Sequence, residues 1–141
     1  MKAAAKRFVL DASVAVAWCF DDEVSEVSEA ALNLLHAGAE LIAPAVWPLE
    51  IANALLVAER RKRISLAQVS ALIDRIGSLP VSLETTDTAR AFGPIFSLAR
   101  ERSLTEYDAA YLELALRRTL PLATLDDQLR RAAHDVGIAL V

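Results

Sequence analysis

Short apolar runs alternate with longer segments of helical character along this chain. Three runs fit buried β-strands: Phe8–Leu10, Leu41–Ala43 and Leu122–Leu125. Val81–Leu83 is a weaker strand, and Ile138–Val141 can add one more at the carboxyl terminus. The pattern therefore predicts four to five short strands.

Helices are predicted between the strands, and local signals mark their ends. Gly38 closes one helix, and Pro48 is tolerated in the first turn of another. A Ser-x-x-Gln capping box begins at Ser65, while Gly93-Pro94 predicts a kink. In chain order, the expected helices are Ala12–Phe20, Glu26–Ala37, Trp47–Arg61, Ser65 to about Ile76, Asp87–Arg102, Thr105–Arg118 and Asp127–Val136.

Strands separated by one or two helices favour right-handed crossovers, which produce a parallel sheet with helices on both faces. The expected fold class is therefore α/β, a three-layer α/β/α sandwich around a short parallel sheet. The 141 residues contain no long stretch rich in Pro, Gly and Ser that could serve as a linker. A single domain over residues 1–141 is expected.

Four acidic residues stand at positions where a buried carboxylate would be unfavourable. Asp11 follows the first predicted strand, and Asp126 follows the apolar run that begins at Leu122. Glu50 and Asp108 lie near the beginnings of two helices. In an open parallel sheet, the ligand crevice lies beyond the carboxyl ends of the strands. The four carboxylates are therefore expected to meet at one edge of the sheet.

Each acid also has an ordinary explanation. Asp11 and Asp126 can cap the helices that follow them, and Asp108 fits a Thr-x-x-Asp capping box. Glu50 is the hardest to explain in this way, because it interrupts a long apolar segment. Asn53, one turn later, can orient Glu50 or contact a substrate, although a partly buried, hydrogen-bonded amide is the simpler interpretation. The hypothesis of a shared site rests on the four acids together.

A cluster of carboxylates favours metal chemistry. Two carboxylates 4 Å apart repel by up to ~4 kcal/mol, and cations relieve that repulsion. A site of carboxylates alone selects hard ions, here Mg²⁺ or Mn²⁺. Two such ions can activate a water molecule and stabilise a leaving oxygen in a hydrolysis reaction. His36 and His134 lie in segments remote from the acids, so no histidine is expected in catalysis.

Composition limits the surface and the partners of the protein. The formal net charge of −4 argues against a surface that attracts nucleic acid everywhere, but it allows a local site. Arg60–Arg63 is the one strong basic run, and it can complement a helix end or contact phosphate. The apolar fraction of 55% suggests that some apolar surface meets a partner.

The amino-terminal region and the cysteine content indicate a cytoplasmic protein. Cys19 is the only cysteine, so no internal disulfide can form. Lys2 and other basic residues precede an apolar stretch, but Asp11 interrupts it, and Val14–Phe20 is too short to span a membrane. Neither a signal peptide nor a membrane segment is expected.

Four short segments resemble the motifs of PIN-domain ribonucleases, specifically VapC-type toxins of toxin–antitoxin pairs. These segments are Val9–Ser13, Pro48–Asn53, Thr105–Tyr111 and Leu122–Asp126. The resemblance spans almost the whole chain and implies a sheet of order 3-2-1-4-5. Asp11, Glu50, Asp108 and Asp126 match the family's acidic quartet, which implies a catalytic and metal-ligating role for each. Asp127 can supply or share the ligand beside Asp126, and Ser13 and Thr124 match hydroxyl positions near the acids.

The resemblance also implies a function. It predicts a metal-dependent endoribonuclease that is the toxin of a type II toxin–antitoxin system, forms a homodimer and binds a VapB-like antitoxin. Trp18 and Phe20 are candidates for the apolar groove that receives the antitoxin. One alternative is a non-catalytic PIN-like domain that binds RNA or another protein. Another is a phosphoryl-transfer domain, although Asp11 lacks the Asp-x-Asp pairing of the dehalogenase type. The sequence leaves the preference for RNA over DNA open.

Overall fold

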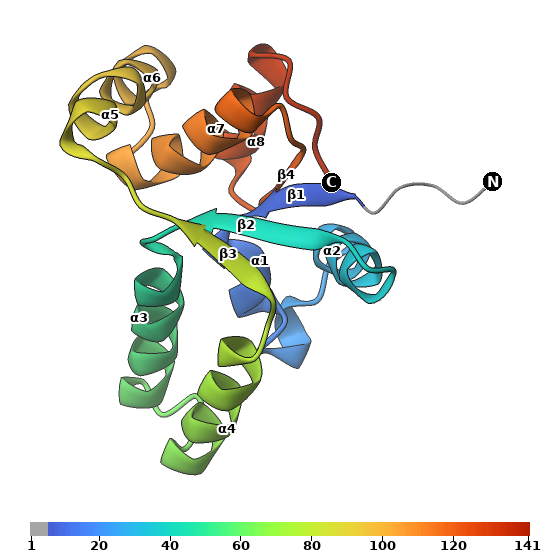
Figure 1. Cartoon of the computed structure of the whole chain (residues 1–141). Helices are drawn as coiled ribbons and strands as arrows, with labels where there is room; N and C mark the ends of the chain where they lie inside the picture. The colour runs from blue at the N-terminus through green and yellow to red at the C-terminus, as the bar shows by residue number, and fades with distance from the viewer. Residues whose placement is uncertain (1–5) are drawn as a thin grey trace.

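The strands form one parallel sheet, as the apolar runs predict. The computed structural model describes residues 6–141, so Lys2 and the rest of residues 1–5 in the expected domain lie outside it. The strands are β1 (Arg7–Leu10), β2 (Glu40–Pro44), β3 (Val81–Glu84) and β4 (Leu122–Ala123). They are all parallel and lie in the order β3-β2-β1-β4 (Figure 1). The neighbouring strands β1 and β4 therefore end side by side.

The expected fifth strand is reduced to a single bridge beside β4. Leu140 pairs with Leu122, whose backbone N–H donates to Ala139 O at 2.9 Å. The fourth strand is also shorter than expected and ends at Ala123. The Leu125 N–H donates to the Ser13 hydroxyl at 3.0 Å, so this backbone group supports the site instead of extending a strand.

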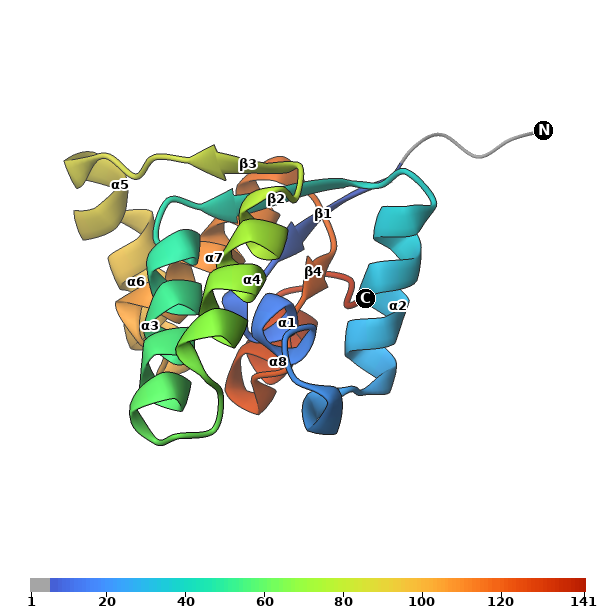
Figure 2. The ribbon, with the colours of Figure 1, turned by 90° about the horizontal axis from the view of Figure 1, so that it is seen from below.

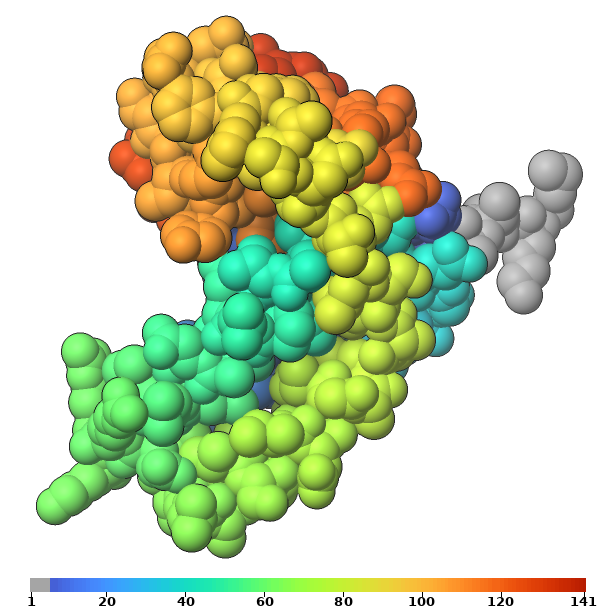
Figure 3. All heavy atoms as spheres, turned by 60° about the vertical axis from the view of Figure 1, so that its left-hand side comes forward, coloured from blue at the N-terminus to red at the C-terminus, as the bar shows by residue number. Residues whose placement is uncertain are grey.

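In residues 6–141, eight α-helices cover the two faces of the sheet. They are α1 (Ala12–Ala17), α2 (Glu26–His36), α3 (Trp47–Arg60), α4 (Leu66–Gly77), α5 (Thr88–Phe92), α6 (Pro94–Arg102), α7 (Glu106–Arg118) and α8 (Asp127–Asp135). Helices α1–α4 lie on one face and α5–α8 on the other (Figures 1 and 2). The three-layer α/β/α prediction is confirmed. On the side where α3 and α5 lie, the two layers form separate lobes with a recess between them (Figure 3).

Two helices differ from their predicted bounds by more than one residue. The first ends at Ala17, and a short 3₁₀ helix, η1 (Asp21–Glu23), follows. The helix predicted over Asp87–Arg102 is broken into α5 and α6 at Gly93. A Cβ at Gly93 would lie 2.7 Å from the Ala89 carbonyl oxygen, and Pro94 has no N–H to continue the helical hydrogen bonds.

The core lies between the sheet and the inner faces of the helices. All of Phe8–Leu10 in β1 and Leu41–Ala43 in β2 is buried, as is Tyr111 in α7. This burial holds the carboxyl ends of the strands, and the residues that follow them, in a rigid frame. Among residues 6–141, none of the helices is long and apolar enough to cross a membrane.

Candidate active site

Asp11 lies at the centre of the candidate site, between β1 and α1. Its side chain is buried, with 4% of the residue exposed. The hydroxyls of Ser13 and Thr124 both donate to Asp11 Oδ2, at 2.5 and 2.8 Å. Within the described chain the Asp11 side chain makes no capping hydrogen bond of good geometry to α1, although the Ser13 backbone N–H lies near the carboxylate and favours its charged form.

The two hydroxyls tie the ends of β1 and β4 together. The Thr124 oxygen accepts the Asp126 N–H at 3.1 Å, and the Ser13 oxygen accepts the Leu125 N–H at 3.0 Å. Each oxygen therefore has a backbone donor on one side and directs its own hydrogen towards Asp11. Ser13 and Thr124 thus fix the orientation of the Asp11 carboxylate, and their supporting role in a reaction stays a prediction.

Asp126 combines a cap with a place in the acidic cluster. Its Oδ1 accepts the Leu129 N–H at 2.8 Å and caps α8, as the ordinary explanation predicts. Its charge also acts on Asp11 and Asp108 and raises the pKa of both. The neighbouring Asp127 is exposed in the first turn of α8 and is not among the charges that shift these pKa values.

Glu50 and Tyr111 connect two helices on opposite faces of the sheet. Glu50 is half-buried in the first turn of α3, and its Oε1 accepts the Tyr111 hydroxyl at 2.7 Å. Tyr111 is fully buried in α7, three residues after Asp108. This contact was not predicted from the sequence. The available signal was the three-residue spacing from Asp108, which places the two side chains on one face of a helix.

Asp108 lies in the first turn of α7 and is half-buried. Its backbone N–H donates to the Thr105 hydroxyl at 3.1 Å, so Thr105 forms its half of the predicted capping box. Asp108 therefore sits at a well-defined helix end, where the positive end of the helix dipole faces a carboxylate.

The four acids interact electrostatically. Burial raises the pKa of Asp11, Glu50 and Asp108 above their usual values. Neighbouring carboxylates raise them further: Asp126 acts on Asp11, while Asp11 itself acts on Glu50 and Asp108. In residues 6–141, no Lys, Arg or His forms an ion pair with any of the four. As the sequence predicts, each of the four acids lies close enough to another for their charges to interact, and their role as a shared site stays a prediction.

The donor set fits a hard divalent cation. Across residues 6–141, no three or more Asp, Glu, His or Cys side chains converge as a ready-made metal cage. Mg²⁺ usually binds through only one or two carboxylates and keeps several waters, so an open cluster of carboxylate oxygens suits it. The assignment of the individual ligands remains a prediction.

Two further predicted contacts can be placed. Asn53 is exposed, which contradicts the prediction of a partly buried amide, and it has no hydrogen bond to Glu50 in the part of the chain that the structure describes.

Within the basic run Arg60–Arg63, Arg63 pairs with Asp22 and Glu23 at 2.7 Å and lies over the Phe20 ring. Only Arg60–Lys62 in that run are exposed and without an ion pair among residues 6–141.

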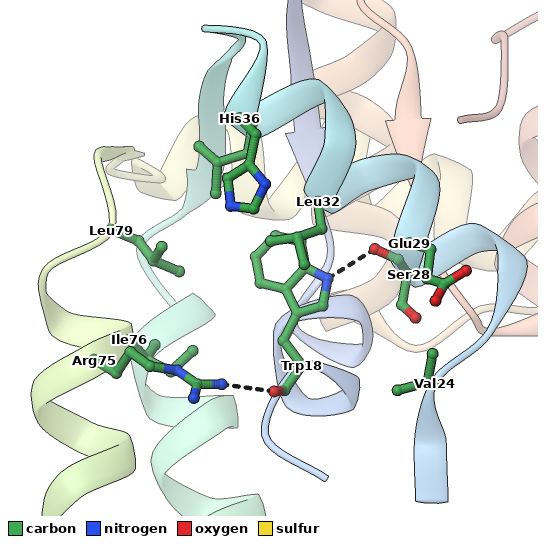
Figure 4. Close-up of a pocket in the computed structure, with 10 residues that line it drawn as sticks. Trp18, Val24, Ser28, Glu29, Leu32, His36, Arg75, Ile76 and Leu79 are labelled. Atoms are coloured by element: carbon green, nitrogen blue, oxygen red, sulfur yellow. Dashed lines mark hydrogen bonds between the residues drawn. The ribbon is translucent and has the colours of Figure 1, made fainter. Parts of the chain in front are cut away.

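An apolar groove of about 400 Å³ lies between the end of α1, helix α2 and helix α4 (Figure 4). Trp18 forms part of its wall and is held by two hydrogen bonds: its indole N–H donates to Ser28 O, and Arg75 donates to Trp18 O, both at 2.8 Å. Leu32, Ile76 and several other side chains also line the groove. Phe20, the other predicted candidate, is buried under Arg63 instead.

Comparison with known proteins places the chain in a family. Residues 8–135 match the model of the PIN domain. Ribonuclease VapC3 of Pyrobaculum aerophilum is 31% identical over 123 residues, covering 87% of this chain and 92% of that protein.

Solved structures agree on the fold. VapC20 of Mycobacterium tuberculosis, described as a toxin that cleaves the sarcin–ricin loop, has a TM-score of 0.63 at 16% identity; the match covers 89% of this chain and 94% of that chain. VapBC2 of Rickettsia felis, bound to a DNA fragment from its promoter, has a TM-score of 0.65 at 12% identity; the match covers 96% and 97%. The resemblance noted in the sequence is thereby confirmed, and the chain belongs to the PIN-domain family, with VapC proteins among its relatives.

Proposed function

We propose that this protein is a divalent-metal-dependent endoribonuclease that acts as the toxin of a type II toxin–antitoxin pair. One observation carries the proposal: four carboxylates near the carboxyl ends of β1 and β4 interact through their charges and have no basic partner in residues 6–141. The likeness to Ribonuclease VapC3 supports RNA as the substrate.

The chain's own groups would hold the cation and the substrate phosphate. Asp11, Glu50, Asp108 and Asp126 are the proposed ligands of Mg²⁺ or Mn²⁺, with two ions when substrate is bound. When bound, the cation supplies the Lewis acidity that phosphodiester hydrolysis requires.

The surrounding groups keep the ligands in place. The Ser13 and Thr124 hydroxyls orient the Asp11 carboxylate, and its burial keeps competing water away from Oδ2. Arg60–Lys62 are exposed and positively charged, and they lie at the opposite end of α3 from Glu50. They would contact phosphates of the RNA on either side of the cleaved bond.

RNA cleavage by the purified protein tests the proposal. With Mg²⁺ or Mn²⁺ we expect cleavage that ends in a 5′ phosphate, and EDTA should abolish it. Asp108→Asn should lower the rate by more than about 100-fold, because even the partners of metal ligands typically contribute 10- to 100-fold. Asp74→Asn, an exposed acid on α4, is the matched control and should cleave normally. Cleavage that persists in EDTA or in Asp108→Asn would reject the metal-nuclease proposal.

The same experiment addresses the choice of substrate. A single-stranded DNA of the same sequence serves as the comparison, and we expect it to be cut more slowly than the RNA. Products with a 2′,3′-cyclic phosphate would contradict hydrolysis by activated water.

We further propose that the groove beside Trp18 receives an apolar segment of a VapB-like antitoxin. The likeness to VapBC2 of Rickettsia felis supports a VapB partner for a protein of this fold. The groove is lined mainly by apolar side chains, with Glu29 and Arg75 as charged groups at its edges (Figure 4). Val24→Glu changes an exposed lining residue, so it should weaken binding of the antitoxin while leaving RNA cleavage intact. Unchanged affinity, measured by calorimetry, would place the antitoxin elsewhere.

The proposed homodimer has candidate contact residues on helices α3, α5 and α6. Phe92, next to the α5–α6 break, is 78% exposed, and Phe96 and Leu49 are exposed as well. Large exposed apolar side chains are typical of a protein interface. Light scattering should give the mass of a dimer for the wild type and of a monomer for Phe92→Glu. A monomeric wild type would contradict the proposed dimer.

A further inference from the structure

Tyr111 touches the acidic cluster without belonging to it. Its hydroxyl donates to Glu50 Oε1 at 2.7 Å, across 61 residues of sequence. The side chain is fully buried, and its helix also carries Asp108. One phenol therefore links the ligand on α3 to the ligand on α7, from opposite faces of the sheet.

The hydroxyl is a permanent donor. At neutral pH a phenol keeps its proton and an ionised carboxylate can only accept, so Tyr111 is the donor of this bond. A buried Tyr hydroxyl requires a partner, and here that partner is a carboxylate rather than a backbone carbonyl. Hydrogen bonds to charged acceptors are stronger than those between neutral groups, so this contact restricts the rotamers of Glu50.

We propose that Tyr111 is a positioning residue that holds the Glu50 carboxylate in the orientation that a divalent cation requires. The inference rests on the proposed function, because it assumes that Glu50 is a ligand. Without the hydroxyl, the cation itself would have to order a flexible side chain. Hydrogen-bonding partners of metal ligands typically change metal affinity by 10- to 100-fold.

Mn²⁺ binding to the full chain, measured without RNA from the electron paramagnetic resonance signal of the free ion, tests the proposal. Tyr111→Phe removes the hydroxyl and keeps the ring that fills the core. We expect its dissociation constant for Mn²⁺ to rise by about 10- to 100-fold. Tyr107→Phe is the matched control, because Tyr107 is exposed and its hydroxyl has no hydrogen bond within residues 6–141. Thermal melting in EDTA confirms that each variant is folded.

A double-mutant cycle separates positioning from a general packing effect. If Tyr111 acts through Glu50, then Tyr111→Phe should weaken Mn²⁺ binding no further in a Glu50→Gln background. Additive losses, or a Tyr111→Phe variant that binds Mn²⁺ like the wild type, would overturn the positioning role alone. A wild-type protein that binds no Mn²⁺ would overturn the proposed function together with this inference.

Discussion

Helix α7 carries two acids whose charged neighbours are opposite in sign. Asp108, in its first turn, faces other carboxylates and has no basic partner in residues 6–141. Glu113, further along the same helix, is more deeply buried, with 8% of its side chain exposed. Arg117 donates to it at 2.9 Å, and Arg90 lies 3.5 Å away. Arg117 also reaches Glu84 at the end of β3, where Arg118 makes a further contact.

The difference shows that burial of an acid does not by itself mark a functional site. Glu113 lies in an apolar helical segment and looks as anomalous in the sequence as Glu50 does. In the fold it belongs to an ion-paired network whose charges are balanced internally. The acidic cluster around Asp11 lacks such partners in the described residues and so depends on protons or an added cation. Missing neutralisation, rather than burial, identifies the candidate site.

The largest effect should come from breaking the ion-paired network. Arg117→Met removes a cation from Glu113 and Glu84 and should destabilise the fold by about 3 kcal/mol, the lower end of the range for a broken buried pair. Arg90 remains near Glu113, which supports the lower figure. Urea denaturation measures the change, with Arg131→Met, at an exposed position, as the control. A loss below about 0.5 kcal/mol would show that the network behaves like ordinary surface ion pairs.

Divalent cations should stabilise the acidic cluster and leave the network unaffected. At a Mn²⁺ concentration of about 100 times the dissociation constant, binding to the folded state should add about 2.7 kcal/mol to the free energy of unfolding. Thermal melting with Mn²⁺ and with EDTA should show this gain in the wild type and in Arg117→Met. The gain should largely disappear in Asp108→Asn. An equal gain in stability in Asp108→Asn would show that the cation binds somewhere other than this cluster.

Neutralising one acid in each region should give effects of opposite sign when EDTA is present. Asp11→Asn removes one of the mutually repelling charges, which can repel by up to about 4 kcal/mol per pair at 4 Å. The amide also weakens the hydrogen bonds that Ser13 and Thr124 donate to the carboxylate, so the net stabilisation at neutral pH should be about 1 kcal/mol. Glu113→Gln removes the partner of Arg117 and should destabilise the fold. The free energies of unfolding are compared by urea denaturation at pH 7. Destabilisation by both substitutions would remove the distinction between the two regions.

The smallest effect concerns pH and follows from the sign of the pKa shifts. The pKa values of Asp11, Glu50 and Asp108 are raised in the folded state, mainly by burial, above the usual 3.8, 4.5 and 3.8. The folded protein then binds more protons than the unfolded chain between the usual and the raised values, so stability falls as pH rises through that window.

In EDTA, the advantage of Asp11→Asn over the wild type should therefore be present at neutral pH and fade on acidification towards the usual carboxyl pKa. Thermal melting across this pH range measures the difference between the two proteins. Saturating Mn²⁺ should remove the advantage at neutral pH, because the cation offsets the same repulsion. An advantage for Asp11→Asn that grows on acidification would contradict the shared cluster.

Much of the fold and of the candidate site follows from local sequence signals. The apolar runs place β1–β3, and caps such as Ser65 mark the helix beginnings within about one residue. The right-handed crossover rule then brings the carboxyl ends of the strands to one edge, which is why Asp11 and Asp126 were expected to meet. The family resemblance added the strand order and the family's acidic quartet.

The sequence could not predict which side chains form contacts when they are far apart along the chain. Tyr111 meets Glu50 across 61 residues, and Thr124 meets Asp11 across 113. The neutralisation of Glu113 also depends on residues from other elements: Arg90 in α5 pairs with it, and Glu84 in β3 shares its partner Arg117.

The sequence by itself determined the succession of strands and helices along the chain and the positions where carboxylates follow strands, because these depend on neighbouring residues and on handedness. The tertiary structure decided which acids are neutralised by arginine and which remain unpaired. It also split the predicted helix at Gly93 and left only a bridge at Leu140. These outcomes depend on distances between side chains from different elements, and such distances exist only once the chain has packed.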